Sequence, residues 1–175
     1  MALIYNSNFY HCNPDRLAEL KILIEKQGSV KNIFEIGTYG GWITLTFSEI
    51  AQKVVTVDYK MSYHPNIDEH IKANSLSNIE WAHSNEFEDL IRDKFSDEID
   101  LVYIHRPGYE NFIKIIKEII SKDVVVIAWD EENDKFVVEK LSKELPKKSK
   151  KSPSKKTSVD SITSSTGSVS GETSL

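Results

Sequence analysis

Two spacings of apolar residues alternate along the chain. Apolar positions three to four residues apart predict amphipathic helices, and short runs of β-branched residues predict buried strands. The expected strands cover residues 32–37, 53–58, 78–82, 100–104 and 122–129. The expected helices cover residues 14–27, 42–51, 66–75, 86–94 and 109–120, with a last helix near 134–144. Within the second helix, Ile43, Phe47 and Ile50 are expected to share the inward face.

Five strands that alternate with helices match a series of right-handed crossovers. Their nearly continuous apolar sequences predict a parallel sheet that is covered on both faces. We therefore expect an α/β fold with a doubly wound, mainly parallel, Rossmann-like sheet of about five strands. No strand signal follows the fifth strand, so a closing antiparallel strand pair is not expected. Ligands of such sheets bind beyond the carboxyl ends of the strands, where the strand order reverses.

The composition changes near Leu145. Beyond it the chain is rich in lysine and then in serine and threonine, and it cannot bury enough apolar area to become ordered. We expect one α/β domain over residues 1–145 and a disordered tail over 146–175. The formal net charge is −5 although the tail has six lysines, so the domain is acidic. An acidic domain repels a phosphate backbone, which favours a small-molecule ligand over nucleic acid.

Compartment and partners follow from a few further features. Cys12 is the single cysteine, which excludes an internal disulfide and a zinc site built on paired thiolates. The chain start lacks a secretory pattern, and the longest apolar run, 124–129, is too short to cross a bilayer. These features predict a cytoplasmic protein without a membrane partner. The lysine-rich tail could direct it to a nucleus, and the unfinished sheet edge could pair with a second copy in a homodimer.

The first expected strand runs into a glycine turn, and the second ends in an acid. The turn contains Gly37, Thr38, Tyr39, Gly40 and Gly41. Glycines allow a tight turn and close approach to a ligand, and the next helix offers unpaired N–H groups. Asp58 ends the next strand, where a carboxylate can accept hydrogen bonds from both ribose hydroxyls. Together they predict a nucleoside site. The simpler alternative is an ordinary turn and a solvated acid.

This pattern resembles the first two motifs of class I S-adenosylmethionine-dependent methyltransferases, and most closely those of the small-molecule O-methyltransferase branch. The resemblance extends over about residues 31–134 in arrangement. It implies that Gly37–Gly41 would approach the amino-acid part of the cofactor, that Glu35 would anchor the turn, and that Asp58 would hold the ribose. It also implies that Ser84 and Asn85 would lie near the adenine.

The function implied by the resemblance is methyl transfer from S-adenosylmethionine to a small-molecule acceptor, with oxygen as the expected acceptor atom. A non-catalytic S-adenosylmethionine-binding or interaction scaffold derived from such an enzyme is the alternative, so enzymatic activity stays open. A nicotinamide-dinucleotide oxidoreductase is less favoured. The turn has Thr38 and Tyr39 after Gly37 instead of the G-x-G-x-x-G pattern that receives a pyrophosphate.

Two strand ends depart from the resemblance. Metal-dependent O-methyltransferases usually place an aspartate after the fourth strand, where this chain has His105, whereas Asp130 after the fifth strand matches. His105, Asp130 and Glu131 could bind a divalent cation, but solvated carboxylates are the favoured interpretation and no metal is expected. His105 is the candidate general base, because an imidazole titrates near neutral pH. Its alternative role is to cap a turn. Arg106 and Tyr109 could face an anionic or aromatic substrate, but the favoured interpretation is structural, with Pro107 and Gly108 as a turn before the next helix and Tyr109 over its first turn.

Overall fold

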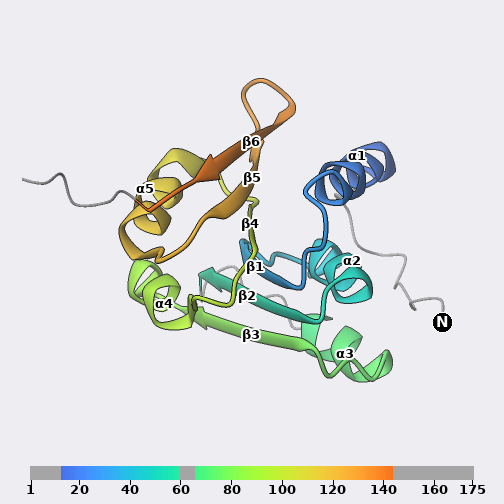
Figure 1. The fold of residues 1–175 in the computed structure, drawn as a ribbon. Coiled ribbons are helices and arrows are strands. Elements are labelled where there is room, and N and C mark those ends of the chain that lie inside the picture. Colours follow the sequence, from blue (N-terminus) through green and yellow to red (C-terminus); the bar gives the residue numbers. More distant parts are fainter. Residues whose placement is uncertain (1–12, 60–65, 144–175) are drawn as a thin grey trace, which may run out of the picture. The chain divides into compact units, whose positions relative to one another are not determined.

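The computed structural model describes residues 13–59 and 66–143. The expected tail, 146–175, and Cys12 lie outside these residues. The strands are β1 Asn32–Ile36, β2 Lys53–Tyr59, β3 Ile79–Ser84, β4 Leu101–Ile104, β5 Val124–Asp130 and β6 Lys135–Leu141 (Figure 1). The helices are α1 Pro14–Glu25, α2 Trp42–Ile50, α3 Asn66–Ala73, α4 Phe87–Lys94 and α5 Tyr109–Ile119.

The strands form one sheet in the order β3-β2-β1-β4-β5-β6. All pairs among β1 to β5 are parallel, and β6 pairs antiparallel with β5. The chain therefore builds the sheet outward from β1 in one direction to β3 and then in the other direction from β4. This reversal confirms the predicted doubly wound α/β fold and places the switch point between β1 and β4.

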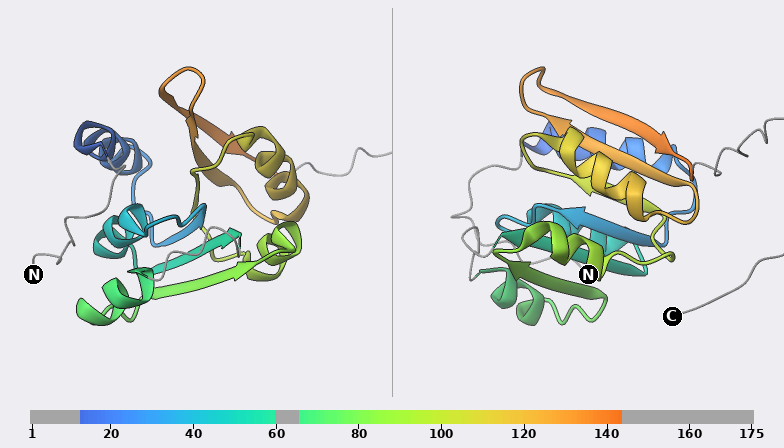
Figure 2. Two further views of the ribbon diagram at one scale, coloured as in Figure 1. Left: turned by 180° about the vertical axis from the view of Figure 1, so that it is seen from behind. Right: turned by 90° about the vertical axis from the view of Figure 1, so that its left-hand side faces the viewer.

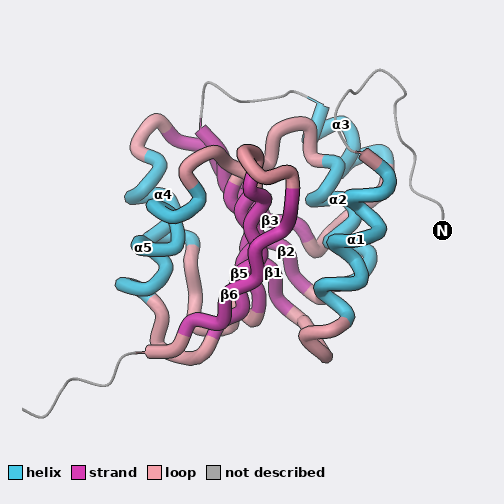
Figure 3. Tube along the Cα trace, turned by 90° about the horizontal axis from the view of Figure 1, so that it is seen from above, coloured by secondary structure: helices cyan, strands magenta, loops and turns pink. Residues whose placement is uncertain are grey.

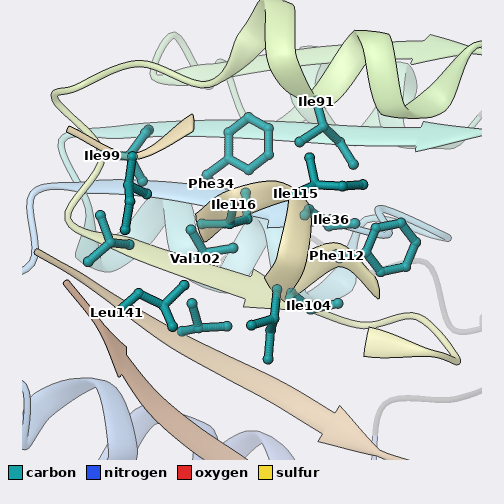
Figure 4. Close-up of a cluster of buried hydrophobic side chains, with 14 of the residues drawn as sticks. Phe34, Ile36, Ile91, Ile99, Val102, Ile104, Phe112, Ile115, Ile116 and Leu141 are labelled. Carbon is teal, nitrogen blue, oxygen red and sulfur yellow. The ribbon is translucent and has the colours of Figure 1, made fainter. Parts of the chain in front are cut away.

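Helices cover both faces of this sheet. Figure 2 gives two further views of the arrangement, and in Figure 3 α1, α2 and α3 lie on one face while α4 and α5 lie on the other. Each face has its own apolar core. The larger core packs α4 and α5 against the sheet and includes Phe34, Val102 and Ile116 (Figure 4). The smaller core, with Leu20, Phe47 and Tyr103, packs α1 and α2 against the opposite face.

The last element differs from the sequence prediction. The helix expected over 134–144 is wrong, because residues 135–141 form β6, which makes six strands in place of about five. A turn over 131–134 reverses the chain, and the Asp130 carboxylate accepts hydrogen bonds from the backbone and side-chain amides of Asn133. Phe136 of β6 packs against one core, and Leu141 lies in the other. Pairing along β5 outweighs the local helical pattern.

A second difference lies in α2. Ile50 was expected on the inward face but is 44% exposed, whereas the polar Thr44 and Thr46 are buried. The hydroxyl of Thr44 donates a hydrogen bond to the carboxylate of Glu35 on β1, which turns this side of the helix toward the sheet. Across residues 13–59 and 66–143, no helix combines the length and the apolar character that crossing a membrane requires.

Candidate functional site: the carboxyl ends of β1, β2 and β4

The glycine turn after β1 has an unusual backbone. Gly37, Tyr39 and Gly41 all have positive φ angles, of 102°, 46° and 79°. Such angles are rare for a bulky residue like Tyr39 and are easily reached by glycine. A Cβ atom on Gly37 would lie 2.5 Å from the carbonyl oxygen of His105, so this position has no room for a side chain. The turn therefore brings the backbone of β1 directly against the end of β4.

Asp58 lies beside this turn, as the sequence predicted. Its strand, β2, pairs in parallel with β1, and Ile36 faces Val57 in the register. The carboxylate is 1% exposed and accepts hydrogen bonds from the backbone amides of Tyr39 at 2.8 Å and Tyr59 at 2.6 Å. The glycine turn and the acid thus meet at one edge of the sheet. Whether a ribose binds there stays a prediction.

The carboxylate also has a cationic partner that the sequence analysis missed. Arg106, which follows β4, forms an ion pair with Asp58 through its guanidinium group. The guanidinium carbon lies 4.4 Å from the centre of the Tyr39 ring and 5.2 Å from that of Tyr59. The side chain is only 13% exposed. The sequence analysis assigned Arg106 to a turn, whereas the structure places its side chain beside the carboxylate of Asp58.

Glu35 and Thr38 face inward. Glu35 is fully buried, accepts the Thr44 hydrogen bond and has its second oxygen without a hydrogen-bond partner in the described part of the chain. Burial raises the pKa of Glu35 to about 7, although the hydrogen bond from Thr44 opposes the shift. The hydroxyl of Thr38 lies 2.6 Å from that of Thr56. The Glu35 contact therefore joins β1 to α2, and the Thr38 contact joins the turn to β2.

Ser84 and Asn85 lie at the carboxyl end of β3, one strand beyond Asp58. Ser84 pairs in register with Tyr59. Its hydroxyl accepts a hydrogen bond of 3.0 Å from the amide of Glu86, just before α4, and Asn85 is exposed. The two residues share the sheet edge with Asp58, and their contact with an adenine stays a prediction.

His105 lies on the side of the edge that leads to β5. Its ring centre is 5.0 Å from that of Tyr39 and 6.0 Å from that of Tyr103. Burial lowers the pKa of His105 to about 4, and the charge of Arg16 acts in the same direction, so the imidazole is neutral at pH 7. His105 lines a pocket between α1 and the sheet together with Asn13, Arg16, Leu17, Leu20, Ile43, Tyr103, Trp129 and Phe136.

Asp130 and the acids after it lie at the turn between β5 and β6. Within residues 13–59 and 66–143, no three His, Cys, Asp or Glu side chains are grouped so that they could hold a metal ion. The Asp130 carboxylate is bound to Asn133, whose side-chain amide holds the pKa of Asp130 below its usual value. Glu131 and Glu132 are exposed. In this chain the residues after β5 close a hairpin.

Comparison with known proteins gives structural matches only. No protein-family model and no curated protein matches the sequence. A candidate O-methyltransferase from Klebsiella pneumoniae superposes with a TM-score of 0.57 and 15% identity, over 68% of this chain and 56% of that chain. A candidate caffeoyl-CoA O-methyltransferase from Staphylococcus aureus gives 0.55 and 21%, over 68% and 58%. Cofactor-bound Rv0187 from MTB gives 0.56 and 18%, over 67% and 56%.

These matches agree with the topology of the sheet. The chain spans a little over half the length of the solved structures that it matches. At these identities the likeness concerns the fold. The chain has the fold of the class I S-adenosylmethionine-dependent methyltransferases.

Proposed function

We propose that this protein binds S-adenosylmethionine at the carboxyl ends of β1 and β2 and transfers its methyl group to an oxygen atom of a small-molecule acceptor. One observation carries the proposal. In a sheet with methyltransferase topology, the backbone amide of Tyr39 in the glycine turn donates a hydrogen bond to the buried Asp58 carboxylate of the adjacent strand.

The residues at this edge fit the cofactor once Arg106 has moved away from Asp58. The turn Gly37–Gly41 offers a backbone without side chains at its three glycines, and Asp58 offers an acceptor for the ribose hydroxyls. Ser84 and Asn85, at the same edge of the sheet, would meet the adenine end. The bound cofactor would supply an electrophilic methyl group on its sulfonium. The contribution of the protein is then to position donor and acceptor in line, which needs no covalent intermediate.

His105 is proposed to face the acceptor. Its unprotonated nitrogen can accept a hydrogen bond from a hydroxyl group, and the aromatic side chains Tyr103 and Trp129 line the same pocket. A pKa of about 4 makes this imidazole a weak base. Its main contribution is therefore to orient the hydroxyl. The hydroxyl proton passes to the imidazole only as the oxygen bonds to the methyl carbon, because the forming bond makes that proton acidic.

A calorimetric titration with S-adenosylmethionine tests the cofactor site. Asp58→Asn should weaken binding by about tenfold or more, because a charged hydrogen-bond acceptor is lost. Asp100→Asn is a matched control. Asp100 also accepts two backbone N–H hydrogen bonds, from Lys31 and Asn32, but at the opposite end of the strands. Equal losses in both variants, or no binding by the unmodified protein, would refute the proposal. Tighter binding of a nicotinamide dinucleotide would favour an oxidoreductase.

A non-catalytic scaffold is the second candidate, and the ion pair between Arg106 and Asp58 favours it, since this contact already uses the carboxylate that a ribose would need. Transfer of a labelled methyl group separates the two candidates. An enzyme should pass the label from S-adenosylmethionine to hydroxyl compounds in a small-molecule extract. A scaffold should bind the cofactor, or only another macromolecule, and leave the label in place.

A further inference from the structure

We infer that the Arg106 side chain is an internal competitor of the nucleoside for Asp58, and that it thereby sets the affinity of the site for its cofactor. The inference rests on the proposed function. Arg106 belongs to the loop after β4, whereas Asp58 ends β2, and β1 lies between these strands in the sheet. The side chain thus crosses the carboxyl end of β1, directly over the glycine turn.

The glycine turn makes room for this crossing. A Cβ atom on Gly37 would lie 3.0 Å from Cγ of Arg106, so any side chain at position 37 would press against the arginine. The rings of Tyr39 and Tyr59 both lie within cation–π distance of the guanidinium group. The arginine therefore has a built site of its own, formed by one carboxylate, two aromatic rings and a gap left by glycine.

This built site is incompletely satisfied. The Nε–H group of Arg106 is buried and has no hydrogen-bond partner within residues 13–59 and 66–143. A buried donor without a hydrogen-bond partner destabilises the folded state, and this cost disappears when the donor is hydrated. The side chain can reach solvent beside the neighbouring loop, because Pro107 and Gly108 are exposed and Gly108 has a φ of 71°. The ion pair holds the arginine in place, and the unsatisfied donor favours its release.

A competing side chain lowers the fraction of molecules in which the site is free to bind the cofactor. When the binding-competent state is only a fraction of the molecules, the apparent dissociation constant rises by the inverse of that fraction. If molecules with Arg106 paired to Asp58 outnumber molecules with Arg106 released by about ten to one, cofactor binding is weakened about tenfold. Removing the guanidinium group should therefore raise the affinity for the cofactor by this factor. Removing a residue that contacts the cofactor should lower the affinity.

The test is a calorimetric titration of the whole chain with S-adenosylmethionine, comparing the unmodified protein with Arg106→Gln. The variant should bind about tenfold more tightly. Arg106→Lys keeps a cation beside Asp58 without the planar fork, so it should bind with intermediate affinity and serves if Arg106→Gln does not fold. Arg92→Gln is the matched control, because Arg92 also pairs with a carboxylate, that of Glu118, between α4 and α5.

Thermal unfolding without ligand gives a second readout. Both a competitor and a purely structural arginine predict a lower melting temperature for Arg106→Gln, since Asp58 stays buried with fewer partners. Only a competitor also predicts tighter cofactor binding. If the unmodified protein binds and Arg106→Gln binds equally or more weakly, the inference is wrong and the proposed function stands. If neither protein binds, the proposed function fails and the inference fails with it.

Discussion

Glu35 gives the sharpest prediction for stability. Its side chain is fully buried beneath the glycine turn, with one carboxylate oxygen bound by Thr44 and the other without a hydrogen-bond partner among the described residues. Replacement by glutamine keeps an acceptor for Thr44 and removes the titrating group. The stability of the unmodified protein should therefore change with pH in a way that the Glu35→Gln variant does not share.

The sign of this pH dependence follows from the pKa values of Glu35 in the unfolded and folded states. Burial raises the pKa of Glu35 from 4.5 to about 7, so between these values the folded state holds a proton that the unfolded state has released. The unfolding free energy must then fall as the pH rises through this range. At about 1.4 kcal/mol for each pKa step of one, the full effect is roughly 3 kcal/mol, present as a penalty above pH 7 and absent below pH 4.5.

The assay is urea unfolding of both proteins at pH 5 and pH 8. The stability difference between Glu35→Gln and the unmodified protein should shift by roughly 2–3 kcal/mol in favour of the variant between these pH values. Any constant cost of the amide cancels in this comparison. Glu49→Gln, an exposed acid on the same helix as Thr44, should show no such shift. A pH-independent difference for Glu35→Gln would refute the reasoning.

Two further predictions concern the turn and the end of β4. His105 has its pKa lowered from 6.5 to about 4, so it should destabilise the fold as the pH falls from 6.5 toward 4, opposite in sign to Glu35; His105→Asn should remove this loss in the same unfolding assay. Should turnover of an identified acceptor survive His105→Ala unchanged, its proposed role is wrong. Gly37→Ala should cost about 2 kcal/mol or more in thermal unfolding, because its Cβ meets the carbonyl of His105. Gly28→Ala, also at positive φ but with open space around it, should cost only about 1 kcal/mol; equal losses would contradict the steric argument.

The sequence predicted the parts of the site that depend on neighbouring strands. Gly37 and Asp58 end consecutive parallel strands, which lie side by side in most α/β sheets, so their meeting follows from local pattern and topology. Arg106 follows β4, and nothing local shows that its side chain reaches across β1. Such a contact is set by tertiary geometry alone.

The other differences have the same origin. Residues 135–141 contain two adjacent valines and could have been recognised as a strand, but their pairing with β5 is what decides the structure. Ile50 faces outward because Thr44, about a quarter of a helix turn away in projection from the expected apolar face, is hydrogen-bonded to the buried Glu35. Ile43 and Phe47 still pack in the smaller core, so the difference from the expected inward face is confined to Ile50.

The central claim, that the glycine turn and Asp58 form a nucleoside site, is tested most directly by a crystal structure of the protein grown with S-adenosylhomocysteine, the demethylated product. The account predicts ribose hydroxyls within hydrogen-bond distance of the Asp58 carboxylate, the amino-acid part along Gly37–Gly41, and the guanidinium of Arg106 turned away from Asp58. A bound product that leaves the pair of Arg106 and Asp58 intact, or that lies elsewhere on the molecule, would contradict it.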